Sequence, residues 1–525
     1  MNEKTIRERA RRFFSFEALA QRLKYVPAHI KTTFAAAMAA GLLTHLYMLT
    51  NKLPNHDDIG HLLGCNYGAA SGRWLLPAVL KISGNFSTPW LNGLLSVLWL
   101  AVACCITVEL LRIRRPFFCV LAAALMVSFP TVTSTLTYMF TADGYFLALA
   151  LACGAVFCAA RFRFGPAAAA VLITLSMALY QSYFSVAAAL CVGTLILDAL
   201  DGDLPTKRLM VQCLRLFLTL LAGLLLYLLT VKISAHFVPL TDYQGISEIG
   251  RFSPADLPKL VADAYRRYGD FFFAASYPLH ASFLKYGLAA SAACTIYQLA
   301  RTAYSRRLPA GKTLLLSALL LVYPLAGNII TVMAPDQKPH LLMLYGLCYA
   351  LLLPLAVTEN AERAERMRKT PQRACACVIA ATLLITSFGY AVAANQAYLK
   401  MDVAGKQLAS YSTRLLSAIE SAPGYIGGMP VALTGYPSSS LPADPSPPLS
   451  EFELLGVFSL RDYLDAYTYG DYLRMYHGFI GTVYSAGSDQ AAYFKALPEV
   501  AAMPAYPSEG SVRVIEGCVV VKLRW

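Results

Sequence analysis

The sequence predicts an all-α polytopic membrane domain of about eleven transmembrane helices, followed by a small C-terminal extracytoplasmic α/β domain. The 525 residues are 57% hydrophobic and only 14% charged, and their mean hydropathy is +0.51. A soluble chain normally needs about 25% charged residues to cover its surface. The apolar residues also gather in runs of about 17–25, which is the length that crosses a bilayer as a helix.

The expected membrane spans follow from these runs. They lie at 33–50, 90–111, 117–136, 145–160, 166–200, 209–235, 284–304, 313–333, 341–357 and 374–394. The run 166–200 is too long for one helix, so we expect two helices with a break near Tyr180-Gln181-Ser182-Tyr183. Ten and twelve spans are the alternative counts, because short paired helices are easily miscounted.

The net charge of +13 is concentrated in short segments between the apolar runs. The clusters after the N-terminal arm are Arg112/Arg114/Arg115, Arg161/Arg163, Lys207/Arg208, Arg306/Arg307/Lys312 and Arg363/Arg366/Arg368/Lys369/Arg373. Basic loops stay on the cytoplasmic side. Alternation from a cytoplasmic N-terminus puts every cluster inside, and puts loops 51–89 and 236–283 and the tail outside. No nucleic-acid partner is expected, because the charge lies at membrane boundaries and forms no continuous face.

Three regions follow along the chain. Residues 1–30 read as a cytoplasmic amphipathic arm lying on the membrane surface, on the pattern FFSFEALAQRLKYV. Residues 31–394 form the multi-span domain. Residues 395–525 form the tail domain, which opens with a helical pattern, continues with a buried strand in MPVALTG, and closes with two strands in SVRVIEGCVVVKL joined at Glu516-Gly517.

The first outer loop carries the main chemical candidates. Asp57 and Asp58 follow span one directly, and two adjacent, half-desolvated carboxylates suit a general base. Arg73 offers a two-pronged donor for phosphate, and Trp74 offers a flat face for a sugar. The alternative is a solvated loop with a capping Asp pair and an interfacial Trp. The residues alone favour neither interpretation.

Other outer groups are weaker substrate-binding candidates, each with a structural alternative. Asp143 could bind an acceptor or cap a helix starting at Gly144. Tyr180 and Gln181 interrupt an apolar run, and polar groups at membrane depth usually line a cavity. Lys338 and His340 could hold a lipid phosphate or anchor span ten at the headgroups. We expect no cofactor, since zinc, EF-hand and phosphate-loop spacings are lacking, although the Asp pair leaves a divalent metal open.

Several segments resemble the type II O-antigen glucosyltransferase (Gtr) family. They are NHDDIG…SGRWLLPAVLKI, TYMFTADGYFLALALA, SMALYQSYFSVAAALCVG and NQAYLKMDVAGKQLASYSTRLLSAIE…MPVALTGYP, so the resemblance runs from about residue 30 to the end. It implies a GT-C-type membrane glycosyltransferase with a catalytic acidic residue in the first outer loop. The acidic motif carries over to Asp57 and Asp58, and the GRW motif to Arg73 and Trp74.

The function predicted from residues and resemblance together is hexosyl transfer, with glucose the expected hexose. The donor is a polyprenyl-phosphate sugar and the acceptor a cell-surface glycan such as O-antigen. A first-loop Asp acts as base and the anomeric configuration inverts. The expected location is the bacterial inner membrane, with dependence on a donor synthase and a flippase. The alternatives are a transporter or flippase of lipid-linked sugars, which would need mid-membrane polar groups, and a surface polysaccharide polymerase or ligase.

Overall fold

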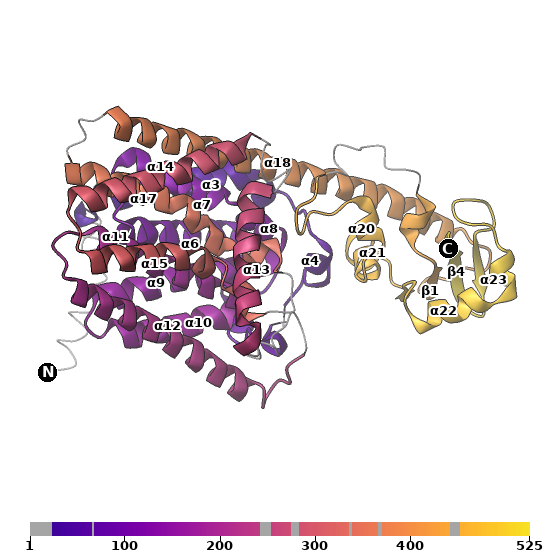
Figure 1. Ribbon diagram of the computed structural model, residues 1–525. Helices are drawn as coiled ribbons and strands as arrows, with labels where there is room; N and C mark the ends of the chain where they lie inside the picture. The colour runs from indigo at the N-terminus through magenta and orange to yellow at the C-terminus, as the bar shows by residue number, and fades with distance from the viewer. Residues whose placement is uncertain are drawn as a thin grey trace.

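The computed structural model describes residues 24–65, 68–241, 254–274, 283–334, 339–365, 370–441 and 452–524. It consists of a helix bundle and a smaller tail, which a single long helix connects (Figure 1). Most of the predicted amphipathic arm, over 1–30, lies outside the described residues.

A helix occupies each segment that was expected to cross the membrane. The bundle helices are α3 (Ala28–Thr50), α6 (Pro89–Leu110), α7 (Pro116–Ser128), α8 (Pro130–Thr137), α9 (Met139–Arg161), α10 (Gly165–Leu179), α11 (Phe184–Leu200), α12 (Thr206–Ser234), α14 (Leu284–Ser305), α15 (Ala310–Gly327), α17 (Cys348–Glu365) and α18 (Thr370–Glu420). The amphipathic α13 (Leu257–Gly269) runs across the end of the bundle nearest the tail (Figure 1).

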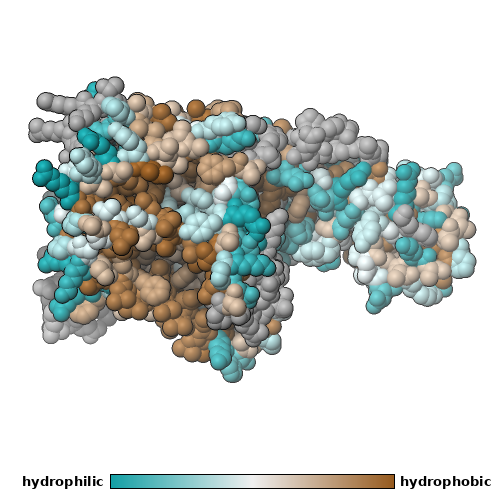
Figure 2. Space-filling view, viewed as in Figure 1, coloured by the Kyte–Doolittle hydropathy of each residue, from teal (hydrophilic) through white to brown (hydrophobic). Residues whose placement is uncertain are grey.

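Within the described residues, seven helices are long and apolar enough to cross a membrane, or eight if the bent pair α7–α8 counts as one span. The helices α10, α14 and α17 are not among them. The count of eleven crossings therefore stays a prediction. Figure 2 shows apolar side chains covering the middle of the bundle, with polar side chains towards its two ends and over the tail.

The breaks between helices follow local chemistry. The predicted interruption near Tyr180 is present, because α10 ends at Leu179 and α11 begins at Phe184. The expected single span 117–136 is instead bent by 41° between α7 and α8. Pro130 causes this bend, since its ring removes a backbone donor and disfavours helical backbone at the preceding residue.

Asp143 corrects one expectation. One of its two predicted roles was to cap a helix starting at Gly144, but α9 begins at Met139 and runs through both residues. Asp143 is buried, and the amide of Asn92 on α6 donates to its carboxylate at 3.3 Å. A polar residue can remain inside a buried helix when a neighbour satisfies it in this way.

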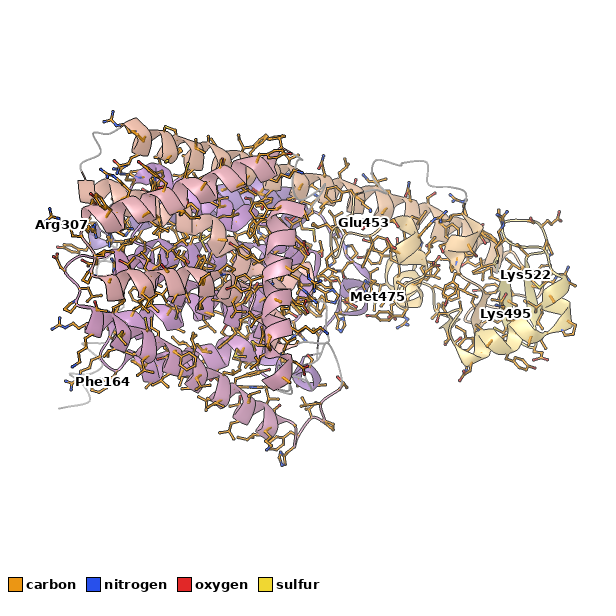
Figure 3. The ribbon with its side chains drawn as sticks, in the orientation of Figure 1. Phe164, Arg307, Glu453, Met475, Lys495 and Lys522 are labelled. Carbon is orange, nitrogen blue, oxygen red and sulfur yellow. The ribbon has the colours of Figure 1, made fainter. Side chains whose placement is uncertain are left out.

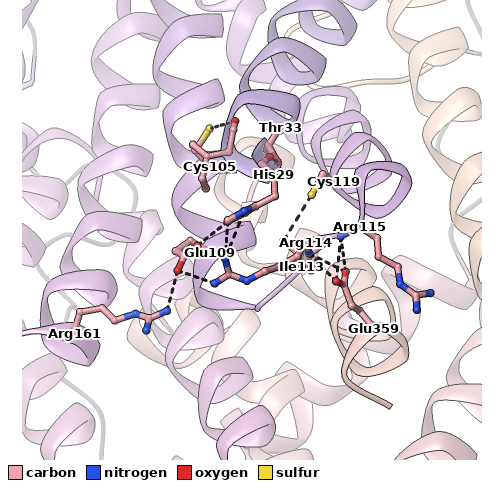
Figure 4. A network of polar contacts seen from close by, with 11 residues as sticks. His29, Thr33, Cys105, Glu109, Ile113, Arg114, Arg115, Cys119, Arg161 and Glu359 are labelled. Atoms are coloured by element: carbon pink, nitrogen blue, oxygen red, sulfur yellow. Dashed lines mark hydrogen bonds and ion pairs between the residues drawn. The ribbon is translucent and has the colours of Figure 1, made fainter. Parts of the chain in front are cut away.

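The end of the bundle away from the tail holds the predicted inner loops. Phe164 and Arg307, in the turns after α9 and α14, both lie at this end (Figure 3). Here Glu109 accepts from His29 at 2.8 Å and from Arg114 and Arg161 at 3.1 Å each (Figure 4). These contacts join α3, α6 and α9. The basic residues at this end therefore also connect the ends of neighbouring helices.

The last bundle helix, α18, continues into the tail. The 51 residues of α18 span roughly 75 Å, so the predicted last span and the predicted tail helix are one continuous helix. Beyond it lies a four-stranded sheet in the order β2-β1-β4-β3. Its strands are β1 (Val431–Thr434), β2 (Val483–Tyr484), β3 (Val512–Ile515) and β4 (Cys518–Lys522).

Pairing within this sheet is mixed. Strand β1 is parallel to both β2 and β4, and β3 is antiparallel to β4. The β3–β4 turn lies at Glu516 and Gly517, which both have positive φ, as a tight two-residue hairpin requires. Strand β2 was not predicted, because two residues leave no periodic pattern. The tail helices are α20 (Leu460–Leu464), α21 (Tyr469–His477), α22 (Asp489–Ala496) and α23 (Pro498–Ala502).

One tail segment docks into the bundle itself. Phe452, Leu454 and Val457 are buried in the same apolar core as the bundle helices. Gly456 has φ +85, and a Cβ at this position would lie 1.9 Å from the hydroxyl of Thr137 at the end of α8. The ammonium of Lys400 on α18 donates to the Phe452 carbonyl at 2.9 Å. These contacts hold the following segment, with α20 and α21, over the loop 51–89, which was predicted to be the first outer loop.

The alternation of basic loops predicts the sidedness of both ends. Reporter fusions after Glu420 should behave as extracytoplasmic and fusions after Arg368 as cytoplasmic. Paired alkaline phosphatase and fluorescent-protein fusions measure this. A cytoplasmic tail would place the outer-loop carboxylates on the wrong side and would overturn the topology.

Candidate functional site

The short helix α4 (His56–Gly60) lies between the bundle and the tail (Figure 1). The Asn55 side chain caps it by accepting from the Asp58 amide at 2.8 Å. Three consecutive side chains then contact different parts of the molecule. Asp57 meets Tyr467 of the tail, Asp58 meets the bundle, and Ile59 joins the apolar core of the tail.

Asp58 is fully buried, with 1% of its side chain exposed. The ammonium of Lys52 lies 2.5 Å from Oδ2, the Ser87 hydroxyl donates to Oδ1, and the Phe140 amide donates to Oδ1 at 3.1 Å. Phe140 is in the first turn of α9, where the helix dipole also favours negative charge. Each of these contacts brings a hydrogen-bond donor or a positive charge to the Asp58 side chain.

Lys52 is held as firmly as its partner. Besides Asp58, its ammonium donates to the Ser87 carbonyl at 3.0 Å and to the Ser87 hydroxyl at 2.6 Å. An ammonium has three protons to donate, so the three contacts account for all of them. The pair thereby ties the residues after α3, before α6 and at the start of α9 into one buried junction.

Asp57 has the opposite environment. Its side chain is 27% exposed, and the Tyr467 hydroxyl donates to Oδ1 at 2.5 Å. The His56 imidazole lies 3.3 Å from the same oxygen, and its ring packs against Phe458 at 4.7 Å and Tyr467 at 5.6 Å between centroids. One carboxylate of the pair is therefore part of the scaffold and the other is accessible from outside.

A second cluster surrounds Arg73, which is buried. Its Nη1 donates to the Tyr145 hydroxyl at 2.7 Å and its Nε to the Gln181 amide oxygen at 3.3 Å. The guanidinium carbon lies 5.2 Å from the Tyr180 ring centroid, and the Tyr145 and Tyr180 rings stack at 4.1 Å. The structure thus brings together Arg73, Tyr180 and Gln181, which the sequence selected separately.

Helix α9 relates the two clusters. Phe140 holds Asp58, and Tyr145 contacts Arg73 five positions further along. At about 1.5 Å per residue, these contacts are roughly 7.5 Å apart along the helix axis. Asp143 lies between them but faces Asn92 of α6. The first two turns of α9 therefore contact both the acidic cluster and the Arg73 cluster.

The remaining candidates lie elsewhere. The Trp74 indole donates to the Thr230 hydroxyl of α12 at 3.3 Å and is half-buried, as an interfacial anchor would be. His340 is exposed, and its backbone carbonyl accepts from Met343 in the turn that follows. Lys338 lies outside the described residues. Among those that are described, no three His, Cys, Asp or Glu side chains form a metal-binding group.

A cavity of about 240 Å³ opens beside the junction. Its walls come from the loop 51–89, α18 and the two tail helices nearest the bundle, and include Lys52, Pro54, Ile59, Lys406, Tyr463 and Tyr476. Burial raises the pKa of Tyr463 far above its usual range, and the nearby Asp58 charge adds to the effect. The phenol therefore stays protonated and donates to the Pro54 carbonyl at 2.7 Å.

Sequence reasoning missed four contributors to these clusters. Lys52 precedes Asp58 by six positions, and Ser87 and Tyr145 come from segments that read as ordinary loop and span. Tyr467 is 410 residues from its partner Asp57. The only available signal was Lys52 itself, a cation placed at a membrane edge directly before two acidic residues.

These observations define a helical membrane protein with two clusters of buried charged groups, around Asp58 and Arg73, in addition to the polar contacts at the far end of its bundle. The model of the family described as glucosyl transferase GtrII matches residues 46–355, which is more than half of the 525 residues. The chain therefore belongs to this family and is a glycosyltransferase. Searches of curated proteins and of solved structures each gave no match.

The Lys52–Asp58 pair yields a test of its structural role. Lys52→Met should strand a buried carboxylate and destabilise the protein by about 3 kcal/mol. The double variant Lys52→Met/Asp58→Asn removes both charges and should recover a measurable part of that loss. Thermal unfolding in detergent reads out both, with the exposed pair Lys406–Asp402 as the matched control. Additive losses in the double variant would contradict a coupled pair.

Proposed function

We propose that this chain transfers glucose from a polyprenyl-phosphate carrier to a cell-surface glycan such as O-antigen, with inversion at the anomeric carbon. The observation that carries the proposal is the contact between the Tyr467 hydroxyl and Asp57 at 2.5 Å. A neutral hydroxyl already lies against the one accessible carboxylate of the pair, as an acceptor sugar hydroxyl would during transfer.

We assign the base to Asp57. An acceptor hydroxyl that replaces the Tyr467 phenol would lie within hydrogen-bond distance of Oδ1, which is the geometry that proton transfer requires. Asp58 is a poorer base, because Lys52, Ser87 and Phe140 already occupy it. Its role in the proposal is to fix α4 and so to hold Asp57 in place.

Arg73 is the candidate for the leaving phosphate. Its planar guanidinium is buried beside Tyr145 and Gln181, and a buried cation stabilises developing negative charge more strongly than a solvated one. In this proposal the donor binds with its phosphate beside Arg73, on the membrane side, and with its reacting carbon towards Asp57.

The donor follows from location. We place the site on the extracytoplasmic side of a bacterial inner membrane, where nucleotide sugars are not supplied. A lipid carrier can diffuse to the bundle with its sugar already flipped, so a donor synthase and a flippase would act before this enzyme. No metal enters this scheme, since Arg73 supplies the positive charge.

Substitution of the acidic pair tests the assignment of the base. Asp57→Asn keeps the shape but removes the base, and should reduce kcat by about 10²–10⁴ while the melting temperature stays near that of the wild type. Asp58→Asn, in contrast, should lower the melting temperature in addition to kcat. Measurement of transfer rate and thermal unfolding on the same preparations separates the two roles. Full activity of Asp57→Asn would exclude it as the base.

The donor prediction needs purified protein in lipid. It should transfer glucose from polyprenyl-phosphate glucose to a surface-glycan acceptor and should leave UDP-glucose unused. Mass spectrometry of the acceptor, with Asp57→Asn protein as the inactive control, detects the added hexose. Efficient transfer from UDP-glucose with no lipid intermediate would contradict the donor assignment and leave the family membership intact.

A further inference from the structure

The tail contains a second cavity, of about 170 Å³, at the carboxyl ends of two of its strands. Leu433 lies in β1, and Tyr436 and Pro437 follow the end of this strand. Ser485, Ala486 and Gly487 follow β2. Strands β1 and β2 are parallel, and the crevice outside the carboxyl ends of parallel strands is where open α/β sheets bind ligands.

The chemistry of this cavity fits a neutral sugar. Tyr436 and Tyr467 are 54% and 68% exposed, and such rings offer flat apolar faces with a polar edge. The Asp465 carboxylate accepts from the Ser438 amide at 3.2 Å and from its hydroxyl, and retains acceptor capacity for further hydroxyls. Among the described residues, the lining includes no lysine or arginine, so phosphate is not the favoured ligand.

The cavity is also connected to the acidic pair. Tyr467 lines it and at the same time donates to Asp57. The segment between α20 and α21 therefore separates two cavities. The one on the bundle side has Lys52 and Lys406 in its walls, whereas the one on the tail side is lined by tyrosines and one carboxylate.

From this placement we infer that the tail cavity is an acceptor subsite, which binds a hexose unit of the surface oligosaccharide one tyrosine side chain away from Asp57. The inference rests on the proposed function, because it assigns the second substrate of the same reaction. The glycan would lie against Tyr436 and Asp465 and would present its next hydroxyl at the position that the Tyr467 phenol occupies.

Binding of the acceptor alone provides the test. Full-length protein in lipid nanodiscs is titrated with a neutral oligosaccharide released from the surface polysaccharide of the host cell, without any donor. Ala486→Trp fills the cavity and Tyr436→Ala removes a ring. Each substitution should raise the Kd roughly tenfold, which is a loss of about 1.4 kcal/mol of binding free energy. Tyr493→Ala is the matched control, since this tyrosine is 51% exposed on α22 and its hydroxyl contacts Glu516.

The two proposals can fail separately. If wild-type protein binds the oligosaccharide and both cavity variants lose affinity, the subsite holds even when polyprenyl-phosphate glucose proves not to be the donor. If both variants fold, as thermal unfolding reports, and their Kd stays within about twofold of wild type, the subsite is wrong although transfer itself can proceed. Absence of oligosaccharide binding by the wild type would also overturn it.

Discussion

The ion pair between Lys52 and the buried Asp58 is the constraint on which the end of the bundle nearest the tail depends. A carboxylate that is 1% exposed is tolerated only with charge and hydrogen-bond partners around it, because desolvation of a lone charge costs several kcal/mol. Its partners come from three separate segments, after α3, before α6 and at the start of α9. The bundle must therefore assemble correctly at this end before the carboxylate is satisfied.

The pair also fixes everything that is attached to α4. With Asp58 held from the bundle side, Asp57 and Ile59 point away from it, since consecutive residues of a helix point in different directions. Ile59 packs into the tail core, and Asp57 receives the Tyr467 phenol. One buried contact in the bundle thereby sets the position of an exposed carboxylate and the docking of a domain more than 400 residues further along the chain.

Sequence reasoning located what local patterns encode. Apolar runs predicted the helices. The polar residues near Tyr180 and the turn residues Glu516-Gly517 predicted breaks that the structure contains. It failed where the outcome depends on a distant partner. The sequence allowed Asp143 to be a helix cap, whereas it lies inside α9 beside Asn92. Pro130 bends a run that hydropathy treats as continuous. Lys52 and Tyr467 could not be paired with the acidic residues, because neither lies at a helical or strand spacing from them.

The tail is attached to the bundle rigidly, so the whole domain cannot easily move away from α4. Helix α18 is continuous from the bundle into the tail, and Phe452, Leu454 and Val457 are fixed in the bundle core, so rotation of the whole domain would expose apolar surface. The Tyr467 side chain is 68% exposed and contacts Asp57 and His56 of α4. Exchange of its phenol for a sugar hydroxyl replaces one hydrogen bond to a carboxylate by another, so the net cost is small compared with the roughly 1.5–3 kcal/mol of the bond itself. Displacement of the partners of Asp58 would instead leave a buried ion pair broken. In the proposed reaction, exchange of an acceptor hydroxyl is therefore far easier at Asp57 than at Asp58.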